Sequence, residues 1–588
     1  MSDESGGGLT GLGKLVSFLL IAGLIGAGAY MIMGKGQPEP VPGPGPGQPP
    51  VTNVTPNVTP GPGPSNSPKE VLEFTDLAET KFEVPKFTPL IPYVMKDNTL
   101  DIELSEYAGY AGLLAANGGL APNENSVFFK KHGVKVRLKL SESDDWTTFG
   151  KGEMAASATT ADVLAVYGRQ FPAVVPLQIG FSRGADGIVV RGDIKRINQL
   201  KGRVIATRQF TEVDFFVRFL AQEAGLDVNM LPDLKTALDP EKLNLIFCEE
   251  AENAVDLFLA DLQAGGNLIA GCAAWAPFTT EAVEKSGGKA RLLIDNRNLL
   301  IIADVLVVHK QFAEQNPKLV AALVDGILEG NKMVRENPNA HLDVIAKAFN
   351  TKHPEKPEWD KGKVLKELAK VHLSNLPESL AFFKGDIDAA GSFGGIYQSA
   401  IMAYGPQLVK NPVAAEKFFD LQHLEALKAA GAFAEQKILI QPIKTQTGEA
   451  LEKDPVLSKD IRFFFEPNSA RLDLTGKDRQ ENDTNLAAIK KLLQISPGST
   501  VLLRGHVDDA MKQKFIEMGG QDLLRKKALE AVQLSKERAE EIRKHLIGQH
   551  AVEAKRLDVH GLGWNEPLSN KTKPELNRRV EVHWFTLE

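Results

Sequence analysis

The chain contains one stretch, Leu15 to Met33, in which nineteen consecutive residues carry no charge. At 1.5 Å per residue this stretch would form a helix of about 28 Å, close to the roughly 30 Å hydrocarbon thickness of a bilayer. The sequence therefore predicts a transmembrane helix at 15–33, with a short cytoplasmic tail at 1–14. A cleaved signal peptide is the alternative, because Ala27-Gly28-Ala29 resembles a small-residue cleavage site. The uncharged run continues through Tyr30 to Met33, which favours the anchor.

Residues 34–81 form a predicted linker. Gly34 to Pro68 hold 12 of the 34 prolines, and Val51 to Pro60 form the near-repeat VTNVTPNVTP. Such a segment cannot bury enough apolar surface to offset the entropy lost on ordering. An extended, polyproline-like spacer at about 3.1 Å per residue could reach close to 100 Å. A flexible linker of no particular length is the alternative.

Length and composition limit the remaining part of the chain. With 588 residues, the chain is long enough for about three or four folded units. The net charge of −7 gives no basic footprint for nucleic acid, so no nucleic-acid partner is predicted. The two cysteines, Cys248 and Cys272, exclude a disulfide-rich scaffold. We expect two buried free thiols at the ends of neighbouring strands; a disulfide is the alternative.

Residues 82–443 alternate short apolar runs with amphipathic segments, which predicts α/β units with parallel sheets. About 360 residues exceed what one such sheet needs, so two lobes are predicted. The strand candidates are 134–140, 187–190, 204–206, 243–248, 267–270 and 305–308. The helix candidates include 213–224, 254–264 and 318–337.

Several motifs in this region resemble the periplasmic substrate-binding proteins of the nitrate, sulfonate and taurine group of ABC importers. These motifs are SVFFKKHGVKV (126–136), FGKGE (149–153), DGIVV (186–190), INQLKGRV (197–204) and AAWAP (273–277). The resemblance implies a bilobal type II binding-protein fold and an ABC importer permease as a partner. It places one lobe at about Leu100–Gly187 plus the segment after Leu299, and the other at Ile188–Asn298.

The resemblance also implies a small solute, expected to be anionic, between the lobes. Anion sites of this kind use helix N-termini and hydroxyl groups as donors. The candidates are Ser105, Thr159, Thr160, Ser182, Thr211 and Trp275. Serine and threonine at such places are also ordinary helix caps, and tryptophan is also ordinary core. Arg183 and Arg208 could supply positive charge, although solvated surface positions suit arginine as well.

A polar segment at 444–459 predicts a second linker, and 460–588 predict a compact α+β domain of order βαβαββ. Its strands are expected at 461–465, 500–504, 556–560 and 578–584, and its helices at 484–493 and 528–547. Four ordered motifs in this domain resemble the OmpA-like peptidoglycan-binding domain: GHVD (505–508), LSKERA (534–539), GLG (561–563) and NRRV (577–580).

This resemblance implies that Asp508 and Arg538 hold the zwitterionic end of diaminopimelate in a peptidoglycan stem peptide. A guanidinium group binds a carboxylate through two hydrogen bonds, and an aspartate accepts from an ammonium group. Asn577 and Arg578 are candidates for glycan contact or for a structural pair. A plain ion pair between Asp508 and Arg538 is the structural alternative.

The predicted helix at 528–547 and the residues before it include departures from the family pattern. Ser535, Ala539, Ile542 and Leu546 recur at helical spacing and predict its buried face. Val507 stands where the family usually has threonine, and Ala531 where it usually has asparagine. The chain between Asp508 and Leu534 is about fifteen residues longer than the common pattern. Losing one polar contact could cost about 1 kcal/mol.

These features together predict an inner-membrane-anchored, cell-wall-attached periplasmic solute-binding protein of a Gram-negative envelope. No catalytic motif, cofactor motif or metal-ligand cluster is recognisable, so an enzyme is not expected, and neither is a cofactor or a metal site. The alternative function is an envelope tether or scaffold whose binding-protein-like region no longer binds a small ligand.

Overall fold

The computed structural model of the chain describes residues 77–87, 91–141, 146–170, 172–352, 354–355, 357–386, 391–440, 457–465, 469–473, 479–495, 499–567 and 577–585. The predicted cytoplasmic tail and transmembrane helix lie outside these ranges, as does most of each predicted linker. Among the described helices, none combines the length and the apolar character needed to cross a bilayer.

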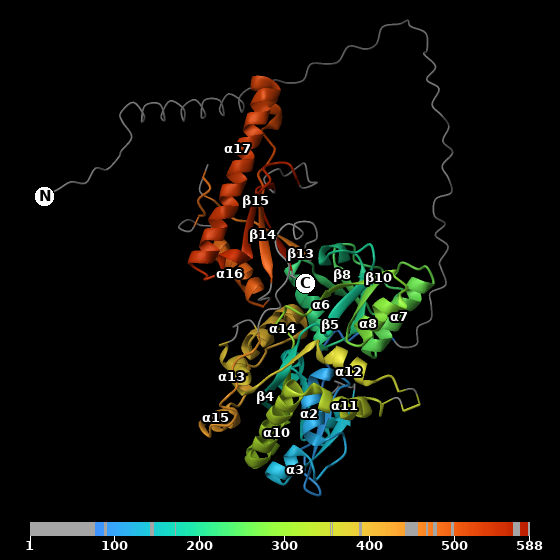
Figure 1. Cartoon of the computed structure of the whole chain (residues 1–588). Coiled ribbons are helices and arrows are strands. Elements are labelled where there is room, and N and C mark those ends of the chain that lie inside the picture. The colour runs from blue at the N-terminus through green and yellow to red at the C-terminus, as the bar shows by residue number, and fades with distance from the viewer. Residues whose placement is uncertain are drawn as a thin grey trace, which may run out of the picture. The chain divides into compact units, whose positions relative to one another are not determined.

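Strands and helices alternate through the described residues (Figure 1). The strands are β1 (Thr99–Leu104), β2 (Lys135–Leu140), β3 (Ala156–Thr160), β4 (Ala173–Ser182), β5 (Asp186–Arg191), β6 (Val204–Arg208), β7 (Val228–Met230), β8 (Leu243–Cys248), β9 (Ile269–Trp275), β10 (Ala290–Asp295), β11 (Ala303–His309), β12 (Val371–Leu373), β13 (Leu457–Ile461), β14 (Thr500–Gly505), β15 (Leu557–Gly561) and β16 (Val580–Phe585). The helices are α2 (Ala111–Asn117), α3 (Val127–His132), α4 (Thr147–Gly150), α5 (Val163–Tyr167), α6 (Glu212–Glu223), α7 (Ala251–Gln263), α8 (Phe278–Lys285), α9 (Lys310–Gln315), α10 (Pro317–Glu336), α11 (Leu342–Phe349), α12 (Lys361–Leu368), α13 (Leu376–Lys384), α14 (Phe393–Leu408), α15 (Gln422–Ala429), α16 (Arg479–Ile495) and α17 (Lys512–Gly548).

Helix ends follow local sequence signals. The hydroxyl of Ser126 accepts a hydrogen bond from the Phe129 amide at 3.1 Å and starts α3. Asn375 and Glu378 form a reciprocal capping box at the start of α13. Gly133 and Gly385, with φ of 70° and 75°, end these two helices in the left-handed conformation that glycine adopts without strain.

The middle of the chain forms two lobes, each built on a six-stranded sheet. The strand order is β12-β4-β11-β3-β1-β2 in the first sheet and β10-β5-β9-β6-β8-β7 in the second. The chain passes from the first sheet to the second between β4 and β5, and it returns between β10 and β11. The two lobes expected from the sequence are therefore present, and both crossings lie within a few residues of the expected boundaries at Gly187 and Leu299.

Both sheets are mixed, so the prediction of parallel sheets was wrong. Strand β5 runs antiparallel to β9 and β10, and β11 runs antiparallel to β3 and β4. The reason is the path of the crossings. The carboxyl end of β4 lies at the same end of the first sheet as the carboxyl ends of β1 and β3. The chain then enters the second sheet as β5 at the end where β6 and β9 have their carboxyl ends. A strand that starts there must run antiparallel to β9, and β11 runs antiparallel to β3 and β4 for the same reason.

One buried asparagine joins the two crossings. The side-chain oxygen of Asn296 accepts hydrogen bonds from the amides of Gly184 at 2.8 Å and Asp186 at 3.2 Å. Its amide group donates to the carbonyl of Ser182 and to the carboxylate of Asp186, each at 3.2 Å. Asn296 is fully buried, so the segment that leaves the first lobe is fixed to the segment that returns to it.

The folded region begins before the predicted boundary at residue 82. Leu77 forms a bridge with Cys248 at the end of β8, and the Ala78 amide donates to the carbonyl of Phe247 at 3.0 Å. The hydroxyl of Thr80 donates to the carbonyl of Leu231. Residues 77–80 therefore pack onto the second lobe, whereas the sequence placed them in the linker.

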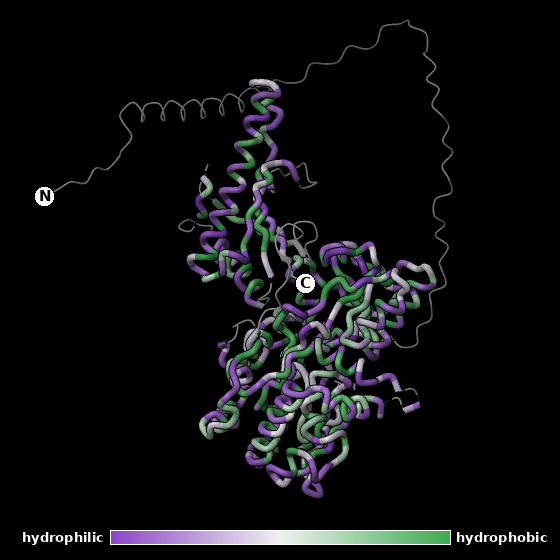
Figure 2. The backbone as a smooth tube through the Cα atoms, in the orientation of Figure 1, coloured by the Kyte–Doolittle hydropathy of each residue, from purple (hydrophilic) through white to green (hydrophobic). Residues whose placement is uncertain are grey.

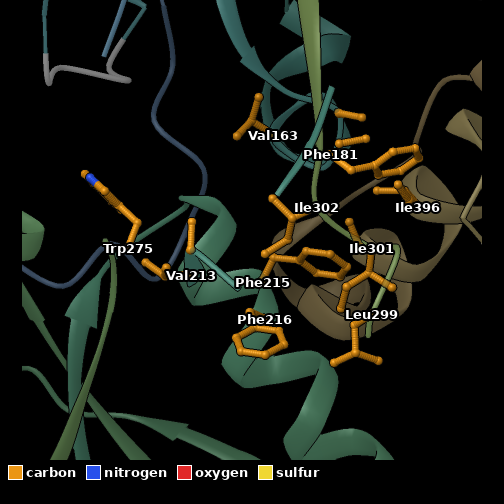
Figure 3. Packing of buried hydrophobic residues seen from close by; sticks show 14 of the residues in the cluster. Val163, Phe181, Val213, Phe215, Phe216, Trp275, Leu299, Ile301, Ile302 and Ile396 are labelled. Carbon is orange, nitrogen blue, oxygen red and sulfur yellow. The ribbon is translucent and has the colours of Figure 1, made fainter. Parts of the chain in front are cut away.

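Apolar side chains from both lobes form one buried core. Figure 3 shows Phe181 of β4, Ile301 and Ile302 of the returning segment, and Phe215 of α6 in this packing. Cys248 and Cys272 are buried free thiols, as expected. Their strands, β8 and β9, are separated by β6; the expectation that they are neighbours was therefore wrong.

The C-terminal domain contains a four-stranded sheet in the order β13-β16-β14-β15, with α16 and α17. The predicted order βαβαββ is confirmed. Two glycines allow α17 to approach this sheet closely. A Cβ atom on Gly505 would lie 2.0 Å from the carbonyl oxygen of Ser535, and one on Gly561 would lie 2.4 Å from that of Val532.

The face of α17 that packs on the sheet is the predicted one. Ser535, Ala539, Ile542 and Leu546 are all buried, together with Ala531. Figure 2 shows hydrophobic and hydrophilic stretches alternating along this helix. The helix begins at Lys512, much earlier than predicted, because the additional residues after Asp508 are helical and are separated from the packed part by a break at Gly519 and Gly520.

Candidate functional site

A small cavity lies where strand ends of the two middle sheets meet. Its volume is about 30 Å³, space for a group the size of about two water molecules. The lining residues are Ser105, Tyr107, Tyr110, Ala158, Thr159, Thr160, Asp186, Glu212, Trp275, Ile302 and Asp304. In sheets of α/β type, ligands bind at the carboxyl ends of strands, where loops and helix starts meet.

Sheet register brings the lining residues together in pairs. Asp304, at the start of β11, lies opposite Thr160, the last residue of β3. Asp186, at the start of β5, lies opposite Trp275, the last residue of β9. Glu212 is the first residue of α6, where the partial positive charge of a helix N-terminus favours a carboxylate.

The two aspartates lie in the interior, at 2% exposure for Asp186 and 1% for Asp304. Burial raises the pKa of Asp186 to about 7; the nearby carboxylate of Asp295 adds to the rise, and the groups of Ser182 and Asn296 oppose it. Burial also raises the pKa of Asp304 well above its usual range, and the carboxylates of Asp186 and Asp162 raise it further. The two aspartates therefore share one buried, acidic environment.

Several polar atoms at this cavity lack a partner among the described residues. Neither oxygen of Asp304 accepts a hydrogen bond of normal geometry, although the hydroxyls of Tyr107 and Tyr110 lie near enough to oppose the rise in its pKa. The hydroxyl of Thr160 is also buried without a partner, and the hydroxyl of Tyr107 makes no hydrogen bond of normal geometry although Ser182 and Asp304 lie beside it. Buried polar groups in folded proteins are usually paired, so unpaired groups around a cavity indicate a place for a ligand or water.

The structure brings four of the six predicted solute-binding residues to the cavity. Ser105, Thr159, Thr160 and Trp275 line it. Ser182 is buried at the end of β4 but is not among the lining residues. Thr211 precedes α6, and its hydroxyl donates to the carbonyl of Arg208 at 3.0 Å, which is a local structural role.

The acidic residues and the two tyrosines of the lining were missed by the sequence analysis, which sought mainly hydroxyl donors for an anion. These residues are Tyr107, Tyr110, Asp186, Glu212 and Asp304. The signal that could have found the aspartates is an acidic residue at the first or second position of an otherwise apolar strand, as in DGIVV and ADVLVV. Among the described lining residues there is no lysine, arginine or histidine.

A lining of carboxyl groups without a basic side chain does not offer the positive charge that the expected anionic solute requires. The two arginines considered for that role serve other contacts. Arg183 donates to the carbonyl of Arg297 at 2.8 Å, and Arg208 forms an ion pair with Glu250 at 3.2 Å. Neither arginine lines the cavity.

A second hollow, of about 560 Å³, lies in the C-terminal domain. Three of the four predicted peptidoglycan-binding residues, Asp508, Arg538 and Arg578, line it. Asp508 follows β14, Arg538 lies on α17, and Arg578 precedes β16. The close approach of α17 to the sheet at Gly505 therefore brings the helix residue and the strand-end residue to one hollow.

The charged groups in this hollow have distinct partners. The Nε atom of Arg578 donates to the Asp508 carboxylate at 2.6 Å. The guanidinium of Arg538 lies over the ring of Phe465, 4.9 Å from its centroid, and its Nε donates to the carbonyl of Ser469 at 3.4 Å. Burial lowers the pKa of Arg538, Arg578 lowers it further, and Asp508 acts in the opposite direction. The pair expected under the plain structural alternative, Asp508 with Arg538, is thus replaced by Asp508 with Arg578.

Asn577 is the predicted residue that lies away from the hollow. It is buried, and its side-chain oxygen accepts from Arg579 at 3.4 Å. The contact is thus with Arg579, and Asn577 lies in the packing next to β16. Val507 does line the hollow and supplies no hydroxyl there, while its backbone amide donates to the carbonyl of Gly563 at 2.9 Å.

Comparison with known proteins identifies the C-terminal part. Residues 464–581 match the OmpA family, so this part of the chain is an OmpA domain. The chain is 28% identical over 142 residues to the outer membrane protein Omp38 from two strains of Acinetobacter baumannii. This match covers 24% of the present chain and 33% of Omp38, so the chain spans about a third of the length of these curated relatives.

Two of the solved structures that are similar to this chain are periplasmic binding proteins. One is the aliphatic sulphonate binding protein SsuA from Escherichia coli, with a TM-score of 0.41 and 15% identity, covering 55% of this chain and 97% of SsuA. Another is the nitrate-binding protein NrtA from Synechocystis PCC 6803, with a TM-score of 0.41 and 13% identity, covering 58% of this chain and 91% of NrtA.

Proposed function

We propose that this chain is a periplasmic solute-binding protein that attaches to the cell wall through its OmpA domain. The observation that carries the proposal is the cavity between the two lobes. It is enclosed by strand ends of both sheets and lined by buried polar groups without partners. A spacer that never binds a ligand has no need of such groups, which cost free energy when they are left unpaired.

The proposed wall attachment is supported by the chemistry of the second hollow. Arg538 presents a partly buried guanidinium group and Asp508 a carboxylate to the same space. An amino-acid terminus carries the complementary pair of charges, a carboxylate and an ammonium group. The proposed ligand is the diaminopimelate end of a peptidoglycan stem peptide. Arg578 would contribute a second cation and would have to exchange its pairing with Asp508 when the ammonium group binds.

The anchor is the third part of the proposal. The uncharged run at 15–33 would hold the chain in the inner membrane by a single pass, with its bulk in the periplasm. An ABC importer permease is the proposed recipient of the bound solute. No catalytic role, cofactor or metal is part of this proposal.

An envelope tether without a ligand is the second candidate function. The small volume of the cavity favours it, because about 30 Å³ leaves little room for a solute in this arrangement of the lobes. The two functions differ in one measurable property. A receptor binds a small molecule and gains thermal stability from it, whereas a tether does not.

The wall-binding part is tested by sedimentation with isolated sacculi. We expect the double substitution Asp508→Ala with Arg538→Ala to weaken sedimentation at least roughly tenfold, because two charge-assisted contacts are lost. The matched control is Asp522→Ala with Arg525→Ala, an acidic and basic pair in the same domain whose side chains are 96% and 79% exposed. Unchanged sedimentation of the first double variant would refute the assigned wall site.

The solute-binding part is tested by the thermal shift of the purified chain against a library of small metabolites. A saturable rise in melting temperature supports the receptor. The absence of any rise across cations, anions and neutral compounds would favour the tether.

A further inference from the structure

The cavity between the lobes is rich in carboxyl groups. Three of its lining residues, Asp186, Glu212 and Asp304, bear carboxyl groups, and the described lining includes no basic side chain. Two of these carboxyl groups are at least 98% buried. A buried carboxylate without a cation nearby is costly, because water no longer stabilises its charge.

The unpaired groups point to a ligand that donates hydrogen bonds. Both oxygens of Asp304, which is 1% exposed, lack a partner of normal geometry among the described residues. An ionised carboxylate only accepts hydrogen bonds, and a protonated carboxyl group still accepts at its other oxygen. A ligand that donates hydrogen bonds therefore suits Asp304 in either state. An ammonium group supplies donors and positive charge together.

Aromatic rings complete the lining. The rings of Tyr107 and Tyr110 lie 5.4 Å apart at an interplanar angle of 83°, and Trp275 lines the same cavity. Aromatic faces attract organic cations through their quadrupole, and tryptophan and tyrosine are well suited to this. A metal ion is the other cation to consider. Within the described ranges, no group of three or more histidine, cysteine, aspartate or glutamate side chains is placed to hold one.

We propose that the solute bound between the lobes is a small organic cation whose ammonium group contacts Asp304 and Asp186. This inference rests on the proposed function as a solute receptor. Tyr107, Tyr110 and Trp275 would surround the apolar part next to the nitrogen atom. Glu212, at the start of α6, would contribute its carboxylate from the second lobe, so that ligand binding joins acidic groups of both lobes.

The test measures binding to the full chain in detergent by isothermal titration calorimetry. The cationic probes are methylammonium, ethanolamine and putrescine; the comparison probes are ethanesulfonate, nitrate and ethylene glycol, with magnesium and zinc chlorides as metal probes. We expect saturable binding of at least one ammonium compound. Asp304→Asn and Asp186→Asn should each weaken it roughly ten- to a hundredfold, as expected for loss of a charged hydrogen-bond partner.

Two further variants make the result specific. Glu212→Gln, at a half-buried position, provides a second test if a buried aspartate variant does not fold, and it should also weaken binding of the ammonium compound. Asp193→Asn is the matched control on the exposed turn after β5, and it should leave the affinity unchanged.

The possible failures are distinguishable. If ethanesulfonate or nitrate bound, and Asp304→Asn strengthened that binding, the proposal of an organic cation as the ligand would be refuted. The proposed function as a solute receptor would still stand. Binding of a divalent metal ion with no ammonium compound would also overturn the organic cation. If none of the probes binds and the wider metabolite library gives no thermal shift, the proposed receptor function fails as well.

Discussion

Asp186 and Asp304 show how a binding site can oppose the stability of its own fold. Both side chains are buried beside other carboxyl groups, and burial raises the pKa of each. A carboxyl group with a raised pKa holds its proton in the folded chain when the unfolded chain has already lost it. Ionisation therefore favours the unfolded state, and the folded state gains only when a cation neutralises the site.

The residue-scale prediction concerns Asp186→Asn without ligand. The folded-state pKa of about 7 lies above the ordinary value of 3.8, so the native stability should fall as the pH rises from about 4 to about 7 and then level off. The rise in pKa corresponds to about 4 kcal/mol at most. Asp186 is faced by Asp295, Asp304, Ser182 and Asn296. Because asparagine does not ionise, the variant should lose less stability over this pH range than the native chain.

Urea unfolding monitored at intervals from pH 4.5 to pH 8.5 measures this effect. Asp193→Asn serves as the exposed control and should follow the native chain at every pH. If the stability of the native chain increased over this range as much as that of Asp186→Asn, the assigned environment of Asp186 would be wrong.

At this scale the sequence predicted some site residues and missed others for a physical reason. Thr159, Thr160 and Trp275 follow from the family resemblance, and the structure places them in the lining. The importance of Asp304 depends on its burial beside other carboxyl groups in a lining without a basic side chain, which is a property of the packed structure. The sequence pattern indicates that an aspartate begins a buried strand, but it does not indicate which side chains surround that aspartate in the folded chain.

The elements around the cavity are connected through the two crossings between the lobes. Asn296 hydrogen-bonds to both the departing and the returning segment, and it also contacts the carboxylate of Asp186. A second connection is made by α14, where the Tyr404 hydroxyl donates to the carbonyl of Thr211 at 3.3 Å before α6. The guanidinium of Arg218 on α6 lies 5.1 Å from the centre of the Tyr404 ring. The arrangement of the lobes is thus held at two places.

The element-scale prediction concerns Asn296→Ala. This substitution removes the side chain that joins the crossings and leaves the amides of Gly184 and Asp186 unpaired. We expect a loss of about 1–3 kcal/mol in unfolding free energy. We also expect weaker solute binding, because the carboxylate of Asp186 loses the group that orients it.

Urea unfolding and calorimetry with the same variant separate these effects. Asn125→Ala, at an exposed position before α3, is the control and should change neither quantity. A variant that lost stability but retained the full affinity would show that Asn296 holds the fold without positioning Asp186.

Sequence patterns predicted the elements better than their directions. Apolar periodicity placed α6, α7 and α10 within a few residues of their observed ends. The antiparallel directions of β5 and β11 were not predicted, because they depend on where the chain enters each sheet. The additional helical part of α17 was noticed only as extra length, since its exposed residues follow no apolar period, as the exposed Met518 illustrates.

On the scale of the whole chain, the proposed function needs two attachments at once. The run at 15–33 would lie in the inner membrane, and the OmpA domain would bind the wall. In this proposal the segment between Gly34 and Pro68 would set the reach of the first attachment, and its proline content predicts an extended length of up to about 100 Å. A chain held at both ends can satisfy both only if this segment is long enough.

Deleting residues 51–68 removes about half of the proline-rich segment and should reduce its extended reach to roughly 50 Å. In cells of a Gram-negative host, we expect the deletion variant to crosslink poorly to peptidoglycan while it stays in the membrane fraction. The same variant, purified, should sediment with isolated sacculi as well as the native chain, because Asp508 and Arg538 are unchanged. Replacing the deleted residues by a different proline-rich sequence of equal length should restore the crosslinking. Equal crosslinking with and without the deletion would mean that the segment does not limit the reach, and the flexible linker of no particular length would then be the better description.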